Sequence, residues 1–135
     1  MSIFAATDFT ISVNAVDLTD HCTNVTTSFD VADLETTAFG DTWTTAVGGL
    51  KSGSLSANFH QDFASSQVDA TLWGALGTVV SVVLKPTSGA VSATNPSFTF
   101  SVLVNSIQPI NASVGDLAVQ QITWPVTGAV TRATS

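Results

Sequence analysis

Apolar and polar residues alternate with a period of two in five segments, and this alternation constrains the fold more than any other feature of the chain. The side chains of a β-strand point to opposite faces in turn, so each segment is predicted to form a strand with one buried and one polar face. The chain is also rich in Thr and Val, whose branched side chains favour a sheet over a helix. The five segments are 9–13, 25–32, 54–60, 97–105 and 121–126.

Residues 78–86, TVVSVVLKP, are different because they are apolar on both faces. This pattern predicts a central strand of the sheet, ended by Pro86. The chain of 135 residues is long enough for one domain with its own core. We therefore predict a mainly β fold in a single domain, 1–135: an antiparallel β-sandwich or barrel with one packed helix.

The one predicted helix covers about residues 66–76. Ser66 followed by Asp69 resembles a capping box, and Gly77 stands where a left-handed residue is expected to end the helix. Trp73 lies beside the apolar stripe and is expected to pack with the helix against the sheet. The stripe itself consists of Val68, Leu72 and Leu76.

Two connections, residues 33–51 and 87–97, are long for loops of a compact domain, and loops of such length often have a function. The first contains ETTAFGDTWTTAVGGL, residues 35–50, which holds Phe39 and Trp43 in a run too rich in Gly and Thr for a helix. Two interpretations are open at this point. The run is either a loop folded over its own core or an arm whose apolar residues are covered by another molecule.

Charged residues are scarce and mostly acidic. They make up 10% of the chain, and ten acids face three bases, which gives a net charge of −7. Tight binding to a phosphate backbone needs clustered Lys and Arg, so this balance argues against a nucleic-acid-binding protein. A surface so poor in charge is also unusual for a free monomer, which favours a protein that functions in an assembly.

No group of reactive side chains predicts catalysis, a metal site or a cofactor. Asp17, Asp20, His21 and Cys22 are the densest group, and they are interpreted as a turn in which Asp side chains bond nearby backbone N–H groups. His60 and Asp62 are expected to share one strand face, but no third metal ligand accompanies them. The single cysteine cannot form an internal disulfide, and the sequence gives no support for an enzyme.

The chain starts without the charged and apolar regions of a signal peptide and has no apolar run long enough to span a membrane. We therefore expect it to be made in a cytoplasm, without membrane contact. The short segment SIFAAT before Phe9 is expected to be either a second small contact arm or a frayed end.

Four stretches, taken together and in this order, resemble the major tail tube proteins of long-tailed bacteriophages of the non-contractile, siphophage type. The resemblance covers most of the chain, and the family has no catalytic motif from which a site could be assigned. The stretches are VDLTDHCTNVTTSFDVADLETTAFGDTW, GGLKSGSLSANFHQDF, VDATLWGALGTVVSVVLKPTSGAVSATNP and VGDLAVQQITWPVTGAVTRAT.

The resemblance implies a structural virion protein whose subunits form six-membered rings that stack into the phage tail tube. Its other partners would be the tape measure protein and the tail terminator and tip proteins, and DNA would pass through the bore without specific binding. It also implies assembly in the host bacterial cytoplasm and no cofactor. The alternatives are another small phage structural protein, such as a head decoration or tail terminator protein, and a monomeric β-sandwich module that binds a ligand.

In the family, a long loop or hairpin between early strands reaches the neighbouring ring, so residues 35–50 would be that arm, with Phe39 and Trp43 as anchors. Acids that line the bore would repel phosphate and let DNA slide. The alternative is that these acids lie on an outer surface, where they aid solubility. The expected contact residues of the arm are Glu35, Thr36, Thr37, Phe39, Asp41, Trp43 and Leu50, and the candidates for the bore are Asp30, Asn58, His60, Asp62 and Gln121.

Overall fold

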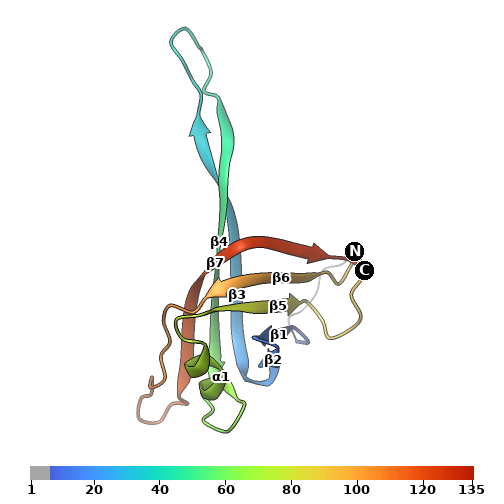
Figure 1. The fold of residues 1–135 in the computed structure, drawn as a ribbon, viewed down its shortest axis with the longest axis vertical. Helices are drawn as coiled ribbons and strands as arrows, with labels where there is room; N and C mark the ends of the chain where they lie inside the picture. The colour runs from blue at the N-terminus through green and yellow to red at the C-terminus, as the bar shows by residue number, and fades with distance from the viewer. Residues whose placement is uncertain (1–6) are drawn as a thin grey trace.

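One antiparallel sheet of seven strands organises the computed structural model, which describes residues 7–135. The apolar segment before Phe9, apart from Thr7, lies outside these residues. The fold of residues 7–135 is mainly β with a single short α-helix, which confirms the predicted fold class (Figure 1). In chain order the elements are β1 (Thr10–Val13), β2 (Val16–Asp17), the 3-10 helix η1 (Thr19–His21), β3 (Cys22–Glu35), β4 (Ala46–His60), α1 (Val68–Ala75), β5 (Val79–Lys85), β6 (Ser97–Leu103) and β7 (Val119–Ala133).

The strand order across the sheet is β2-β1-β5-β6-β7-β4-β3, and β7 connects the two halves. Residues 119–125 of β7 pair with β4, whereas residues 126–133 pair with β6. Gly128 has a φ of +91° at the place where the β6–β7 register shifts, a conformation that glycine adopts without strain. The strand bends strongly along its length (Figure 1), so the two halves of the sheet enclose one core.

The inward-facing residues of the alternating segments form this core, as the sequence predicts. Leu55, Phe59 and Trp124 are fully buried, and they pack with Phe100, Val102 and the buried residues of β1 and β5. The helix α1 closes one end of the core with three buried side chains, which are Val68, Leu72 and Ala75.

Two strands differ from the prediction because their apolar residues are not all covered. β5 is central, as predicted, with hydrogen-bonded neighbours on both sides, but only one of its faces is buried. Val79 on the other face is 57% exposed. On β3, Phe29 and Val31 continue the apolar alternation and are also exposed. The alternation is therefore real, but this chain alone does not bury every apolar face.

The helix is shorter than predicted and begins without the expected capping box. Ser66 has a φ of +60°, and no side chain caps the helix, whose N-cap residue is Gln67. The N–H of Asp69 instead donates to the Asp62 carbonyl, 3.0 Å away. Gly77 does adopt the predicted left-handed conformation, with a φ of +84°.

The expected packing of Trp73 against the sheet is wrong, because this side chain is 63% exposed. Leu76, the third residue of the expected stripe, follows the last helical residue and is also exposed. Only the first two residues of the stripe, Val68 and Leu72, enter the core. In the part of the chain that the structure describes, no helix has the length and apolarity that crossing a membrane requires.

Candidate assembly surfaces

A two-stranded hairpin projects far beyond the body of the molecule (Figure 1). β4 pairs with β7 only from Ser54 to His60, whereas its earlier residues pair with β3 alone. We call residues 29–53 the arm, because no third strand supports the hairpin there. At about 3.3 Å per residue, the strands of the arm extend roughly 20 Å from the body. An isolated two-stranded ribbon is marginally stable in water, so this arm is expected to gain stability from contact with another surface.

The arm is more regular than the long irregular connection expected at residues 33–51. β3 continues to Glu35 and β4 begins at Ala46, so only residues 36–45 form a loop. We call these residues the tip. The correction comes from pairing between the two strands: the ladder between β3 and β4 continues from the body to the pair Glu35 and Ala46, although Gly48 and Gly49 lie inside β4. The Thr residues of this stretch are confined to the tip.

Side-chain hydrogen bonds give the tip a defined shape. Thr36 and Thr45 are joined by backbone and hydroxyl bonds of 2.9 and 2.6 Å, and Thr37 Oγ1 accepts from the Thr45 N–H at 2.8 Å. Asp41 closes the outermost turn, because its Oδ2 accepts from the Ala38 N–H at 2.8 Å and its own N–H donates to the Ala38 carbonyl. Gly40, with a φ of +94°, supplies the left-handed residue of this turn.

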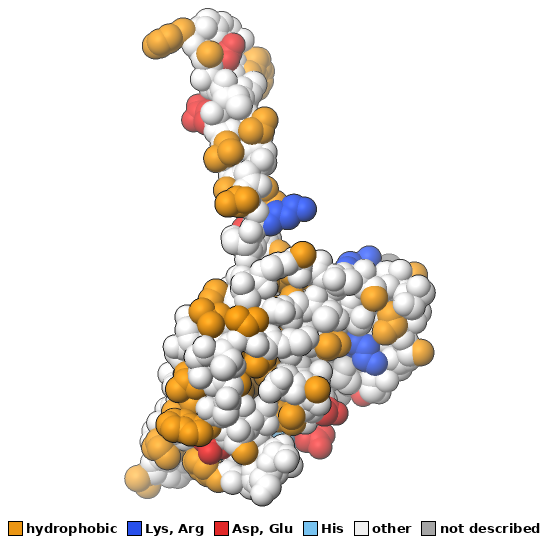
Figure 2. Space-filling model, in the orientation of Figure 1, with side chains coloured by type: hydrophobic (Ala, Val, Ile, Leu, Met, Phe, Trp, Pro, Cys, Tyr) orange, Lys and Arg blue, Asp and Glu red, His pale blue; other side chains and the backbone are white. Residues whose placement is uncertain are grey.

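The aromatic residues of the tip point into solvent. Phe39 is 109% exposed, Trp43 83% and Leu50, on the arm strand β4, 87%. Figure 2 shows further apolar side chains along the arm, where Val31, Leu34 and Val47 are also exposed. These residues do not pack on the core of their own chain, so the interpretation as a folded-back loop is wrong. The contact role of the arm stays a prediction.

At the junction between arm and body, an aromatic contact joins the arm to the core. The ring of Phe29 meets Phe100 of the core edge to face, with ring centroids 5.8 Å apart. Opposite Phe29 in the register stands Gly53, where an added Cβ would lie 2.5 Å from Phe29 Cδ1. The absence of a side chain at Gly53 therefore gives Phe29 the room it needs to reach Phe100.

We expect the substitution Gly53→Ala to push Phe29 away from Phe100 and to lower the free energy of unfolding by about 1–3 kcal/mol, the usual cost of overpacking. Urea denaturation followed by tryptophan fluorescence measures this change. The matched control is Gly74→Ala, because an added Cβ there meets no atom within 4 Å. Equal stability of Gly53→Ala and the unsubstituted protein would contradict the role of this junction.

Three of the five candidates for the bore lie on the outer face of the sheet, opposite the core, and a fourth, Asp30, lies on the same side where the arm begins. Asn58 and Gln121 are direct cross-strand partners, His60 pairs with Val119, and Asp30 pairs with Ser52. Their neighbours on this face are mostly hydroxyl-bearing, and Ser56 Oγ lies 3.2 Å from Thr123 Oγ1. The face is therefore richer in hydroxyl and amide groups than in acids.

The fifth candidate, Asp62, does not share a strand face with His60, because β4 ends at His60. Its carboxylate lies 2.8 Å from His21 Nε2 and accepts from the Ala64 N–H at 2.9 Å. The hydrogen bond from Ala64, followed by the bond to His21, lowers the pKa of Asp62 from its ordinary value. Asp62 thus ties η1 to the segment that precedes α1.

The group at residues 17–22 forms a turn, as predicted. Asp17 Oδ1 accepts from the Thr19 N–H at 2.9 Å, and bonds to the hydroxyl and N–H of Thr19 lower the pKa of Asp17. Burial raises the pKa of the Cys22 thiol, so the more nucleophilic thiolate is disfavoured. Among residues 7–135, no group of three or more His, Cys, Asp or Glu side chains could hold a metal ion.

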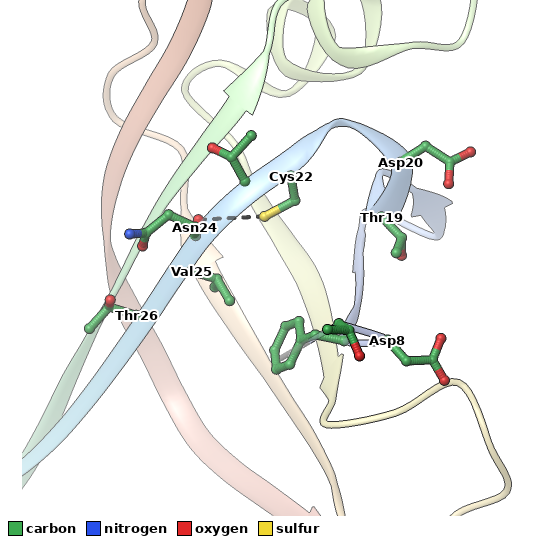
Figure 3. A pocket seen from close by; sticks show the side chains of 10 residues that line it. Asp8, Thr19, Asp20, Cys22, Asn24, Val25 and Thr26 are labelled. Carbon is green, nitrogen blue, oxygen red and sulfur yellow. Dashed lines mark hydrogen bonds between the residues drawn. The ribbon is translucent and has the colours of Figure 1, made fainter. Parts of the chain in front are cut away.

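An open hollow of about 690 Å³ lies between the start of β1 and the start of β3. Figure 3 shows that the Asp8 and Asp20 carboxylates point away from Cys22, Asn24 and Val25 on the other side of the hollow. Asp8 Oδ2 instead accepts from the Ser88 hydroxyl at 2.7 Å. The polar groups diverge here, whereas a small-molecule site brings them together around a ligand.

Both ends of the sheet expose backbone hydrogen-bonding groups. β3 is the last strand of the sheet at one end, and within residues 7–135 its outer side pairs with no strand. At the other end stand the short β2 and its neighbour β1. A long unprotected edge such as that of β3 is a template for pairing with a further strand.

The sequence interpretation missed a further group of exposed apolar residues around α1 and the β6–β7 connection. The available signal was the presence of Ile110, Val114 and Leu117 in a turn-rich stretch without strand or helix periodicity. Such residues have no predicted core face to occupy, which makes them candidates for an exposed contact surface.

No protein-family model and no curated protein matches the chain. Its structure is similar to a chain in the virion of a native gene transfer agent particle, with a TM-score of 0.78 and 17% identity over 98% of this chain and 100% of that one. It is also similar to a chain in the tail of an empty gene transfer agent particle with C6 symmetry, with a TM-score of 0.63 and 18% identity over 85% and 83% of the two chains. The chain therefore has a fold that is present in the virion and tail of gene transfer agent particles.

Proposed function

We propose that this protein is a structural subunit of a phage-type tail, in which six copies form a ring and the rings stack into a tube. The observation that carries the proposal is the arm: a preorganised hairpin with exposed Phe39 and Trp43, on a fold similar to that of a chain in a C6-symmetric tail. Preorganisation lowers the entropic cost of binding, which suits a contact that repeats in every ring.

The open edges of the sheet support lateral assembly within a ring. Pairing between the edge strand β3 of one copy and the opposite end of the sheet in the next would continue the sheet from subunit to subunit. In a ring of six, the last subunit would pair with the first, so that every strand edge in the ring would have a hydrogen-bonded neighbour. The arm would make the second contact, between rings stacked along the axis. This contact does not lead back to the first ring, so rings can be added without limit.

The outer face of the sheet would line the bore, with Asp30, Asn58, His60 and Gln121 among its residues. A lining of hydroxyl and amide groups with few cations offers no strong attraction to phosphate, so DNA could pass without specific binding. The acids would contribute through the negative charge of the whole ring. The chain would reside in the virion tail, assembled in the host cytoplasm with the tape measure, terminator and tip proteins.

Electron microscopy of the purified protein tests the proposal directly. We expect rings with six-fold symmetry and, at high protein concentration, tubes of constant diameter. The free strand edges and the apolar arm should make this assembly depend steeply on concentration. Particles that stay monomeric at every concentration would contradict the proposal, and binding to capsids without tube formation would favour a decoration protein.

A further inference from the structure

The end of the molecule that carries α1 exposes a group of large apolar side chains. Their exposed fractions range from 42% to 105%, which is unusual for so many large apolar residues in one region. We call this group the basal surface. It consists of Phe63, Trp73, Leu76, Ile110, Val114 and Leu117.

Hydrogen bonds join the segments that carry these residues. Gln61 Nε2 donates to the Pro109 carbonyl at 2.7 Å, and the Gln61 N–H donates to the Ala118 carbonyl at 3.1 Å. Past the helix, the Gly77 N–H donates to the Val104 carbonyl at 2.7 Å. The β6–β7 connection is therefore fastened both to the segment before α1 and to the segment after it, and the basal surface is one region of the fold.

The basal surface and the tip lie at opposite ends of the long axis of the molecule. In Figure 1 the arm extends upward, whereas α1 and the β6–β7 connection lie at the bottom, and Figure 2 shows apolar side chains gathered at that lower end. β3 starts in the lower body and ends at the tip, and its fourteen residues measure roughly 45 Å at the usual rise of a strand. Copies arranged head to tail along this axis would bring one tip to the next basal surface.

The two surfaces also match in chemistry. All three cations of the chain, Lys51, Lys85 and Arg132, lie on strands outside both the tip and the basal surface. An ion pair therefore cannot hold the two surfaces together, whereas apolar contact can. The hollow beside β3 suits the apolar tip less well, because its lining is mostly polar and includes Asp8, Thr23 and Asn24.

We infer that the basal surface is the seat for the arm tip of a second copy of this chain, with Phe39 and Trp43 packed against it. The inference rests on the proposed function, since it names the surface that receives the arm in a stack of rings. The contact is head to tail and gives the tube a direction: one end presents free tips and the other presents free basal surfaces. Because the acids Asp41, Asp69 and Asp116 accompany the two surfaces, added salt should strengthen stacking by screening their repulsion.

Two variants test the inference. The tip variant carries Phe39→Ser and Trp43→Ser, and the basal variant carries Trp73→Ser, Val114→Ser and Leu117→Ser. All five side chains are at least 63% exposed, so circular dichroism should show both variants folded. Alone, each variant should form single rings without tubes. An equal mixture should form paired rings and stop there, because the intact tips of one variant meet the intact basal surfaces of the other.

Electron microscopy and sedimentation velocity distinguish the outcomes. Tubes from the basal variant, at the concentration where the unsubstituted protein forms them, would overturn the inference and leave the proposed function standing. Rings of both variants that never pair in the mixture would also overturn it. Failure of the unsubstituted protein to form any ring or tube would instead reject the proposed function, and this inference with it.

A cross-linking experiment measures the contact itself. In a Cys22→Ser background, Thr44→Cys beside Trp43 is combined with Ser113→Cys beside Val114, and a short bismaleimide is added to assembled tubes. Each copy then carries both reactive positions, so a ladder of linked chains is expected. The control pairs Thr44→Cys with Ala93→Cys, an exposed position in the β5–β6 connection. Equal ladders from both pairs, or a ladder from the control alone, would contradict the docking of the tip on the basal surface.

Discussion

Replacement of residues 37–44 by Asn-Gly should give a folded protein that no longer forms tubes. Thr36 and Thr45 already form a hydrogen-bonded pair, so a two-residue turn can close the shortened hairpin. The change removes both Phe39 and Trp43. Burial of one large apolar side chain contributes about 1.5–3 kcal/mol, so the loss of two would raise the concentration needed for stacking by roughly 100- to 10,000-fold.

Light scattering against protein concentration measures this threshold, and electron microscopy shows what remains. Rings should persist, because the tip does not belong to the sheet edge that is proposed to join neighbours. The control is Thr44→Ser, which keeps the length of the tip and both aromatic residues and should assemble normally. Tubes of normal length from the shortened protein would show that the arm does not hold the rings together.

Trp124→Ala should cost about 3–5 kcal/mol of the free energy of unfolding, the usual range for removing a buried Trp or Phe. Trp124 is fully buried among the core residues, and its Nε1–H donates to the Ser106 carbonyl at 2.8 Å. The substitution leaves a cavity and an unpaired carbonyl at once. Since domains are stable by only about 5–15 kcal/mol, the substitution would remove a large fraction of that stability.

The other two tryptophans provide the control for this experiment. Trp43 and Trp73 are mostly exposed, so Trp43→Ala and Trp73→Ala should each change the free energy of unfolding by less than about 0.5 kcal/mol. Urea denaturation followed by circular dichroism compares the three variants on one scale. A loss at Trp73 as large as that at Trp124 would mean that α1 packs differently from this structure.

The strands and their core faces could be predicted from the sequence because alternation is a local property. Leu55, Phe59 and Trp124 alternate with polar residues, and the structure buries them as expected. The turn at Asp17 and the left-handed Gly77 could be predicted for the same reason, since short-range geometry determines them.

The failures concern what covers an apolar residue, which the local pattern does not specify. Val31, Trp73 and Val79 have the spacing and type of core residues, but they are exposed. A period-two or helical stripe indicates that one face of the element is apolar. It does not indicate whether residues of the same chain or of another copy bury that face. The capping box at Ser66 failed differently, because a backbone bond from Asp69 to Asp62 took its place.

The arm is not a separate attachment, since its two strands run without interruption into the body. A pulling force on the tip would therefore act along the strands. It would load the hydrogen bonds between β4 and β7, from Ser54 to His60, in shear. Hydrogen bonds loaded in shear resist together, whereas bonds opened from one end yield one after another. A filament built from such subunits would carry tension and bending through its sheets, so its mechanical strength would come from the same strands that form its core.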